Sequence, residues 1–124
     1  MEPFYNNDKS CLAVLVSYHY GLGWSTEANN LHLAYDKRII KFYLDHCDNE
    51  SWMNQLKNRT SAASNELREF IHSMPEYKNA YVSPSGFYNC VIEWIPVGVP
   101  YTIQTYVGFE RLVARSDMQW IYVI

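Results

Sequence analysis

The pattern of apolar and polar positions divides the chain into an N-terminal strand, a helical middle and a C-terminal group of strands. The segment Cys11–Tyr20 is almost continuously apolar through its middle, which predicts a strand buried on both faces. Apolar residues at three- and four-residue steps then predict an amphipathic helix over Leu31–Cys47 and a second helical region over Trp52–Met74. Pro75 ends that region.

The second helical region contains a polar interruption at residues 58–61. The side chains of Asn, Thr and Ser compete for backbone hydrogen bonds, so Thr60 or Ser61 is a candidate N-cap for a new helix. The pattern therefore predicts either one bent helix or two helices.

After Pro75 the pattern changes to a polar and aromatic loop over residues 76–86, followed by short runs that are typical of strands. Turn residues separate these runs. The predicted strands are Phe87–Ile95, Tyr101–Val107, Phe109–Arg115 and Met118–Ile124. The last run is apolar up to its end, which is typical of a strand that completes a sheet or pairs with a second subunit.

These elements predict one α+β domain over residues 1–124. An N-terminal strand and a C-terminal meander of three or four strands form a mainly antiparallel sheet, and two or three helices pack on one of its faces. The hydrophobic share of 48% against 19% charged residues indicates a folded chain, because a disordered chain is rich in charge and poor in apolar side chains.

Composition restricts the partners and the location that we expect. A net charge of −3 with dispersed basic residues argues against general nucleic-acid binding, and no apolar run is long enough to span a membrane. The first eight residues lack the basic start of a secretory signal, so we expect a cytoplasmic protein. Cys11, Cys47 and Cys90 form no closely spaced pair, and buried reduced thiols are the favoured interpretation.

No motif in the sequence specifies a reaction. Gly21-Leu22-Gly23 is too short for a phosphate-binding loop, and the four histidines share no metal-ligand spacing, so we expect neither cofactor nor metal. The enzyme that the residues would best allow is a small hydrolase in which His19 works with Glu93 or Glu110 as acid and base. Exposed strand charges are the commoner explanation for both carboxylates.

Two segments are candidate recognition surfaces. The 11 tyrosines make the chain rich in rings that combine contact area with a polar tip, as binding surfaces require, although strands also favour tyrosine. The first candidate surface follows the N-terminal strand and consists of Tyr18, His19, Tyr20, Trp24, Ser25 and Thr26. The second lies among the predicted C-terminal strands and consists of Tyr101, Tyr106, Phe109, Glu110 and Arg111. The alternative for the first segment is a lid that folds back on the core.

Four segments resemble a group of small uncharacterised proteins that bacteriophages encode. They are Tyr18–Thr26 (YHYGLGWST), Ala34–Arg38 (AYDKR), Ile92–Ile103 (IEWIPVGVPYTI) and Tyr106–Glu110 (YVGFE). The resemblance covers most of the chain and implies a viral setting without a mechanism. Small phage accessory proteins often bind and disable a host factor, so the resemblance implies an anti-defence protein.

The leading hypothesis is a non-enzymatic viral accessory protein that binds a host component through its aromatic surface and forms a homodimer. The component is a host protein or a nucleotide, in which case a ring stacks on the base and Arg38, Arg111 or Arg115 reaches the phosphate. A structural component of the phage particle is a further alternative.

Overall fold

The computed structural model describes residues 2–18, 23–106 and 109–114, and of Tyr106 and Phe109 only the backbone. This part of the chain has the α+β organisation that the sequence predicts, with a strand first, helices next and strands last. The elements are β1 (Cys11–Ser17), α1 (His32–Tyr35), α2 (Lys37–His46), α3 (Glu50–Gln55), α4 (Ala62–Ser73), the 3-10 helix η1 (Pro75–Tyr77), α5 (Pro84–Tyr88), β2 (Cys90–Pro96), β3 (Tyr101–Tyr106) and β4 (Phe109–Ala114).

The described strands form two separate antiparallel sheets of two strands each. β1 pairs with β2, with Cys11 opposite Pro96 and Ser17 opposite Cys90, and β3 pairs with β4. The single sheet with a C-terminal meander that the sequence indicated is therefore not what these residues form. Pro96 and Pro100 flank the connection, and Gly98 has a φ of +87°, so the chain turns away from β2 before β3 begins.

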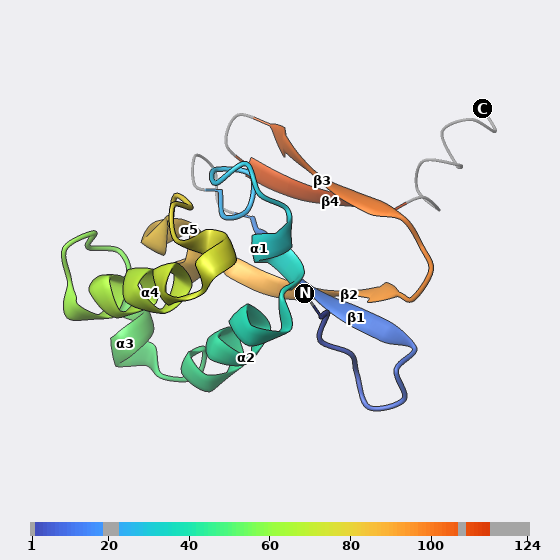
Figure 1. Ribbon diagram of the computed structural model, residues 1–124, viewed down its shortest axis with the longest axis horizontal. Helices are drawn as coiled ribbons and strands as arrows, with labels where there is room; N and C mark the ends of the chain where they lie inside the picture. The colour runs from blue at the N-terminus through green and yellow to red at the C-terminus, as the bar shows by residue number, and fades with distance from the viewer. Residues whose placement is uncertain (1, 19–22, 107–108, 115–124) are drawn as a thin grey trace.

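β1 lies between two apolar clusters, which explains why its sequence is apolar at nearly every position. Ala13 and Leu15 belong to the larger cluster beneath the helices, whereas Val14 and Val16 belong to a smaller one beneath α1, β3 and β4. Successive side chains of a strand point to opposite faces, so one strand supplies both clusters. Accordingly the β1–β2 sheet lies between the helices on one side and the β3–β4 sheet on the other (Figure 1).

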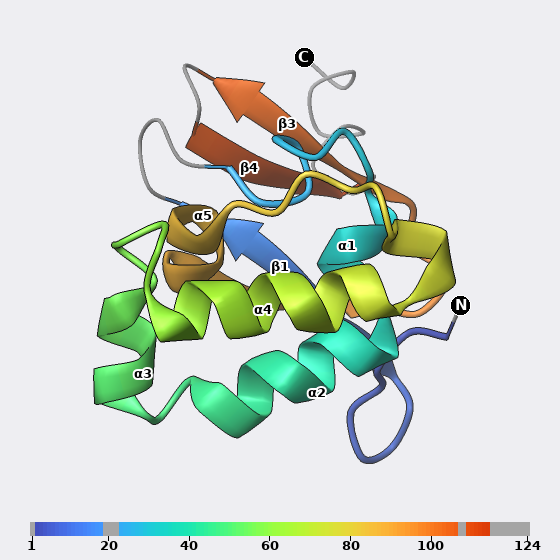
Figure 2. The ribbon, with the colours of Figure 1, turned by 60° about the vertical axis from the view of Figure 1, so that its left-hand side comes forward.

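The helical middle is divided more often than its periodicity indicates. The predicted helix over residues 31–47 breaks at Asp36, whose extended ψ of 125° ends α1 and whose carboxylate accepts from the backbone N–H of Arg38 to cap α2. The second region is two helices, and Ser61 caps α4 by accepting from the N–H of Ser64. The alternative of two helices with a cap at Ser61 is thus confirmed, and α2 and α4 lie side by side (Figure 2).

The loop predicted for residues 76–86 also contains helical turns. η1 begins at Pro75 and α5 begins at Pro84, since proline is well suited to a first helical turn, where its missing N–H costs no bond. α5 ends at Tyr88, so β2 starts three residues later than the predicted strand did.

Phe42 of α2 stacks on Phe70 of α4, with ring centroids 4.3 Å apart, and this contact joins the two long helices. None of the helices in the described ranges is long and apolar enough to cross a membrane.

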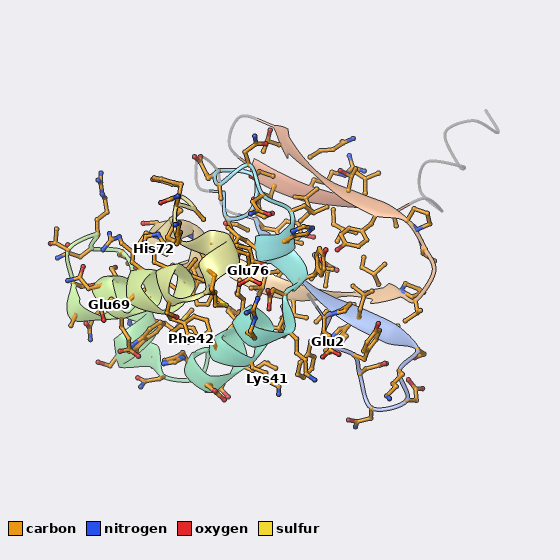
Figure 3. The ribbon with its side chains drawn as sticks, viewed as in Figure 1. Glu2, Lys41, Phe42, Glu69, His72 and Glu76 are labelled. Atoms are coloured by element: carbon orange, nitrogen blue, oxygen red, sulfur yellow. The ribbon has the colours of Figure 1, made fainter. Side chains whose placement is uncertain are left out.

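The buried Asp36 anchors the start of α2 through three hydrogen bonds from two side chains. Arg38 donates to both of its carboxylate oxygens, at 2.7 and 3.1 Å, and the hydroxyl of Tyr77 donates at 2.8 Å. Arg38 also pairs with Glu76 of η1 at 3.0 Å, while Lys37 pairs with Glu2. Figure 3 shows Glu2 and Glu76 near the start of α2. This network therefore fixes the N-terminal segment and η1 to α2.

The Asp36 network predicts a dependence of stability on pH. Burial by itself raises the pKa of Asp36, but the hydrogen bonds from Arg38 and Tyr77 outweigh it and hold the pKa below its ordinary value. A carboxyl whose pKa is lowered in the folded protein stabilises it fully above the unfolded pKa, near pH 4, and loses that contribution as the pH falls through the folded pKa. Asp36→Asn is expected to lower the free energy of unfolding by about 2 kcal/mol at pH 7.

Urea denaturation at pH 7 and at pH 3 measures this difference. The difference in free energy of unfolding between the wild type and Asp36→Asn should be smaller at pH 3, because the wild-type carboxyl begins to take up a proton there. Asp45→Asn, at an exposed position of α2, is the control and should change little at either pH. An equal loss for Asp36→Asn at both pH values would contradict this account.

Candidate functional site

Glu110 of the second predicted surface is completely buried, and the exposed strand charge that the sequence favoured is wrong for this residue. One carboxylate oxygen accepts from the backbone N–H of Ser17 at 2.8 Å. The other accepts from the N–H groups of Trp24 and Thr26, at 2.8 and 3.0 Å, and from the hydroxyl of Thr26 at 2.5 Å. These bonds tie the end of β1 and the segment 23–26 to β4. The carboxylate thus compensates for its burial with four donors.

Trp24 lies in the core, not on the surface where the sequence indicated it. Its ring contacts Phe87 edge-on at 5.0 Å, and its Nε1–H donates to the carbonyl of Leu33 at 2.8 Å. The buried indole thus has its one donor satisfied, which is the usual condition for a tryptophan inside a protein. For Trp24 the alternative of a segment that folds back on the core is the correct one.

Gly23 and Gly86 allow this segment to pack tightly on α5. A Cβ atom on Gly86 would lie 1.9 Å from the carbonyl oxygen of Gly23, closer than any real contact. One on Gly23 would lie 2.6 Å from the hydroxyl oxygen of Thr26. Gly86 therefore permits the close approach of two backbones, and Gly23 leaves room for the side chain of Thr26.

A small pocket opens between this segment and β3. Its volume is about 160 Å³, and its lining consists of Ser25, Thr26, Asn29, Asn30, Leu31, Thr102 and Ile103. Ser25 is only 1% exposed, and its Oγ has no hydrogen-bond partner in the described part of the chain. A buried hydroxyl without a partner is uncommon in native proteins. The pocket thus brings Ser25 and Thr26 of the first predicted surface next to the strand that carries Tyr101.

Tyr18 and Arg111 lie at a second meeting point of the two predicted surfaces. The hydroxyl of Tyr18 donates to Glu93 of β2 at 2.5 Å. Burial, and then this hydrogen bond, raises the pKa of Tyr18 to about 12, whereas the nearby charge of Arg111 acts in the opposite direction. Tyr18 is half-buried and Arg111 exposed. The phenol is neutral at physiological pH and serves as a donor.

The remaining predicted site residues differ in what they contribute. Tyr101 packs on the smaller cluster, and burial raises its pKa to about 12. Arg38 is held by Asp36 and Glu76, so it is not a free phosphate ligand. Several predicted positions lie outside the described residues: His19, Tyr20, Arg115, the strand Met118–Ile124, and the side chains of Tyr106 and Phe109.

The hydrolase alternative depends on His19, and it stays a prediction because His19 is among those positions. Glu93 and Glu110 do not face each other across neighbouring strands, since β2 pairs with β1 and β4 with β3. Both oxygens of Glu110 are already hydrogen-bonded to the backbone or to Thr26. Among the described residues, no three His, Cys, Asp or Glu side chains are grouped so as to hold a metal ion.

The three cysteines are free thiols, as the sequence analysis favoured, but only Cys90 is fully buried. Burial raises the pKa of Cys90 well above its ordinary value and also raises that of Cys47, which is partly exposed. A raised pKa leaves both thiols largely protonated and therefore weak nucleophiles. Cys11 is also partly exposed.

The sequence analysis missed an apolar edge along β2. Val91, Trp94 and Val97 are exposed by 45, 46 and 50%. In the described chain β2 has a neighbouring strand on one side only. A larger groove of about 620 Å³ lies at the start of β2 and is lined by Tyr43, Cys47, Asp48, Glu50, Met53, Asn54, Tyr88, Asn89, Cys90 and Val91. Apolar alternation in the sequence marks a strand, but it does not show which strand lies at an edge.

Comparison with known proteins adds no further information: no family model, curated protein or solved structure matches this chain.

Replacing Ser25 tests whether its hydroxyl is unsatisfied in the protein. Ser25→Ala removes a buried hydroxyl that bonds to none of the described residues, so the free energy of unfolding should stay the same or rise by about 1 kcal/mol. Ser64→Ala is the matched control, because Ser64 is equally buried but its hydroxyl donates to the carbonyl of Asn58 at 2.7 Å. That variant should lose about 1 kcal/mol in the same urea titration. A larger loss for Ser25→Ala than for Ser64→Ala would contradict this assignment.

Replacing Glu110 tests how much its hydrogen bonds to Ser17, Trp24 and Thr26 stabilise the fold. Glu110→Gln puts an amide NH₂ group opposite one of the two sets of donors, so it should lower the free energy of unfolding by about 3 kcal/mol. Glu93→Gln, which keeps an oxygen to accept from Tyr18, is the control and should cost less than about 1 kcal/mol. Thermal unfolding of both variants measures the difference, and equal losses would show that Glu110 is not the stronger anchor.

Proposed function

We propose that the protein is a non-catalytic binding protein that docks on a host protein through the free edge of β2, the edge without a neighbouring strand among the described residues, and thereby sequesters or inhibits it. The resemblance to phage accessory proteins supplies the viral setting of this proposal. The observation that carries it is the exposure of the apolar side chains of Val91 and Trp94 on β2 and of Val97 directly after it.

The free edge of β2 is suited to the addition of a strand. Unpaired backbone groups at a sheet edge are a ready template for another chain, and proteins normally protect such edges with charges. β2 carries one charged side chain, Glu93, and this carboxylate accepts from Tyr18. Val91 and Trp94 point to opposite faces of the strand, so apolar surface borders the edge on both sides.

Trp94 is the expected centre of the contact. Tryptophan is among the residues that contribute most to binding energy when a partner covers them. The ring of Phe4, which packs against the larger cluster, lies 6.4 Å from the ring of Trp94 and supports it from the N-terminal segment. The exposed indole is therefore held in place before a partner arrives, which lowers the entropic cost of binding.

The groove beside β2 favours a partner segment with a basic side chain. Asp48 and Glu50 line it, and neither forms an ion pair with a described residue. Lys57 lies over the ring of Tyr88, 4.9 Å from its centroid, so that aromatic wall already has a cation. A second copy of this chain would bring the same two carboxylates to a symmetric interface, which disfavours a homodimer at this edge.

Peptide binding tests the proposal. On an array of extended peptides, the protein should favour β-forming segments with Lys or Arg over the same segments with Glu. Trp94→Ala should weaken binding about thirtyfold, because it removes a residue worth about 2 kcal/mol at an interface. Tyr81→Ala, at a more exposed aromatic residue outside β2, is the control and should bind like the wild type.

Capture of partners from a host lysate with the same three proteins extends the test. A host protein retained by the wild type and by Tyr81→Ala, but lost by Trp94→Ala, would support docking at β2. Equal recovery by all three, or a dimer in light scattering that Trp94→Ala converts to monomer, would overturn it.

A further inference from the structure

The pocket beside Ser25 adjoins a buried hydroxyl that has no hydrogen-bond partner among the described residues, and we infer that the pocket binds a neutral, hydroxyl-rich ligand of the size of one sugar ring. This site is distinct from the β2 edge and does not depend on the docking proposed above. The inference starts from the Oγ of Ser25, which is buried and unpartnered among the described residues. A hydroxyl both donates and accepts, so a ligand hydroxyl satisfies it in either orientation once the Ser25 side chain turns toward the pocket.

The lining of the pocket defines the chemistry of the ligand. Thr26, Asn29, Asn30 and Thr102 supply hydroxyl and amide groups, and of the described residues that line the pocket none is charged. Leu31 and Ile103 add apolar walls. Hydroxyl groups that alternate with C–H faces are the surface of a sugar or a cyclic polyol, and they match polar partners set beside aliphatic ones.

The carboxyl group of Glu110, which lies behind the pocket, disfavours anionic ligands. Thr26 donates its hydroxyl to a carboxylate oxygen of Glu110, so an acidic group lies one side chain behind the pocket wall. A phosphate or carboxylate in the pocket would lose its hydration and meet no described cation to replace it. A phosphorylated sugar is therefore expected to bind less well than its neutral parent.

Backbone hydrogen bonds within residues 25–30 hold one wall of the pocket in shape. The N–H of Asn30 donates to the carbonyl of Ser25 at 3.0 Å, and that of Asn29 donates to the carbonyl of Thr26 at 3.1 Å. On the opposite wall, alternate residues of β3 direct their backbone N–H and C=O groups away from β4, so either Thr102 or Ile103 presents such a pair. The volume of about 160 Å³ equals that of about five water molecules, enough for one ring.

Titration with matched neutral and charged probes tests the site. The neutral probes are D-ribose, D-glucose and adenosine, and the charged ones are ribose 5-phosphate, glucose 6-phosphate and AMP. Protein-observed NMR at millimolar probe concentrations should give saturable shifts for at least one neutral probe and about tenfold weaker binding of its phosphorylated form. The ribose, glucose and adenosine arms distinguish a free pentose, a hexose and a nucleoside as the source of the ring.

Substitutions locate the binding. Ser25→Ala should weaken the best probe about tenfold without loss of stability, a combination that a merely structural serine does not give. Thr102→Val is the second variant and should weaken the same probe, while Ser51→Ala, on the exposed side of α3, should not. No saturable shift with any neutral probe, stronger binding of the phosphorylated forms, or binding unchanged in both pocket variants would overturn the inference.

Discussion

The buried carboxylate of Glu110 is the interaction on which the arrangement of this protein depends. Without its donors the charge could not be buried, and without the charge the N–H groups of Ser17, Trp24 and Thr26 would lose their acceptor. These groups come from the end of β1 and from the segment after it, while Glu110 comes from β4. One side chain thus connects the two sheets and determines where the segment lies.

The position of β1 determines which edge of the β1–β2 sheet is accessible to a partner. Because residues 13–17 of β1 are buried and its far edge meets residues of the N-terminal segment, this part of β1 offers no surface to a partner. The edge of this sheet that has no neighbour among the described residues is that of β2, where the apolar side chains of Val91 and Trp94 are exposed. The small pocket has a different origin, since it lies where the clamped segment meets β3. The two candidate sites therefore depend on different parts of the framework.

Local signals were sufficient to predict the class of the fold and most elements, and long-range contacts account for the errors. The apolar run of β1 and the cap at Ser61 depend on neighbours in the sequence. The role of Glu110 depends on partners 84 to 93 residues away, and the strand pattern suggested only an exposed charge. Trp24 was assigned to the surface because a tryptophan beside glycines looks the same whether it faces solvent or the core. The hint available in the sequence was that Glu110 alternates with Leu112 and Ala114 and therefore belongs to an apolar face of β4.

The separation between Ser17 and Glu110 along the sequence also affects how the chain folds during translation. β1 is synthesised early, but β2 follows more than 70 positions later and Glu110 is 93 residues beyond Ser17. During translation β1 is therefore an apolar segment without its paired strand, and the segment after it has no anchor. β1 and the segment after it can therefore reach their final contacts only after Glu110 has been synthesised, and until then the apolar side chains of β1 lack the partners that bury them.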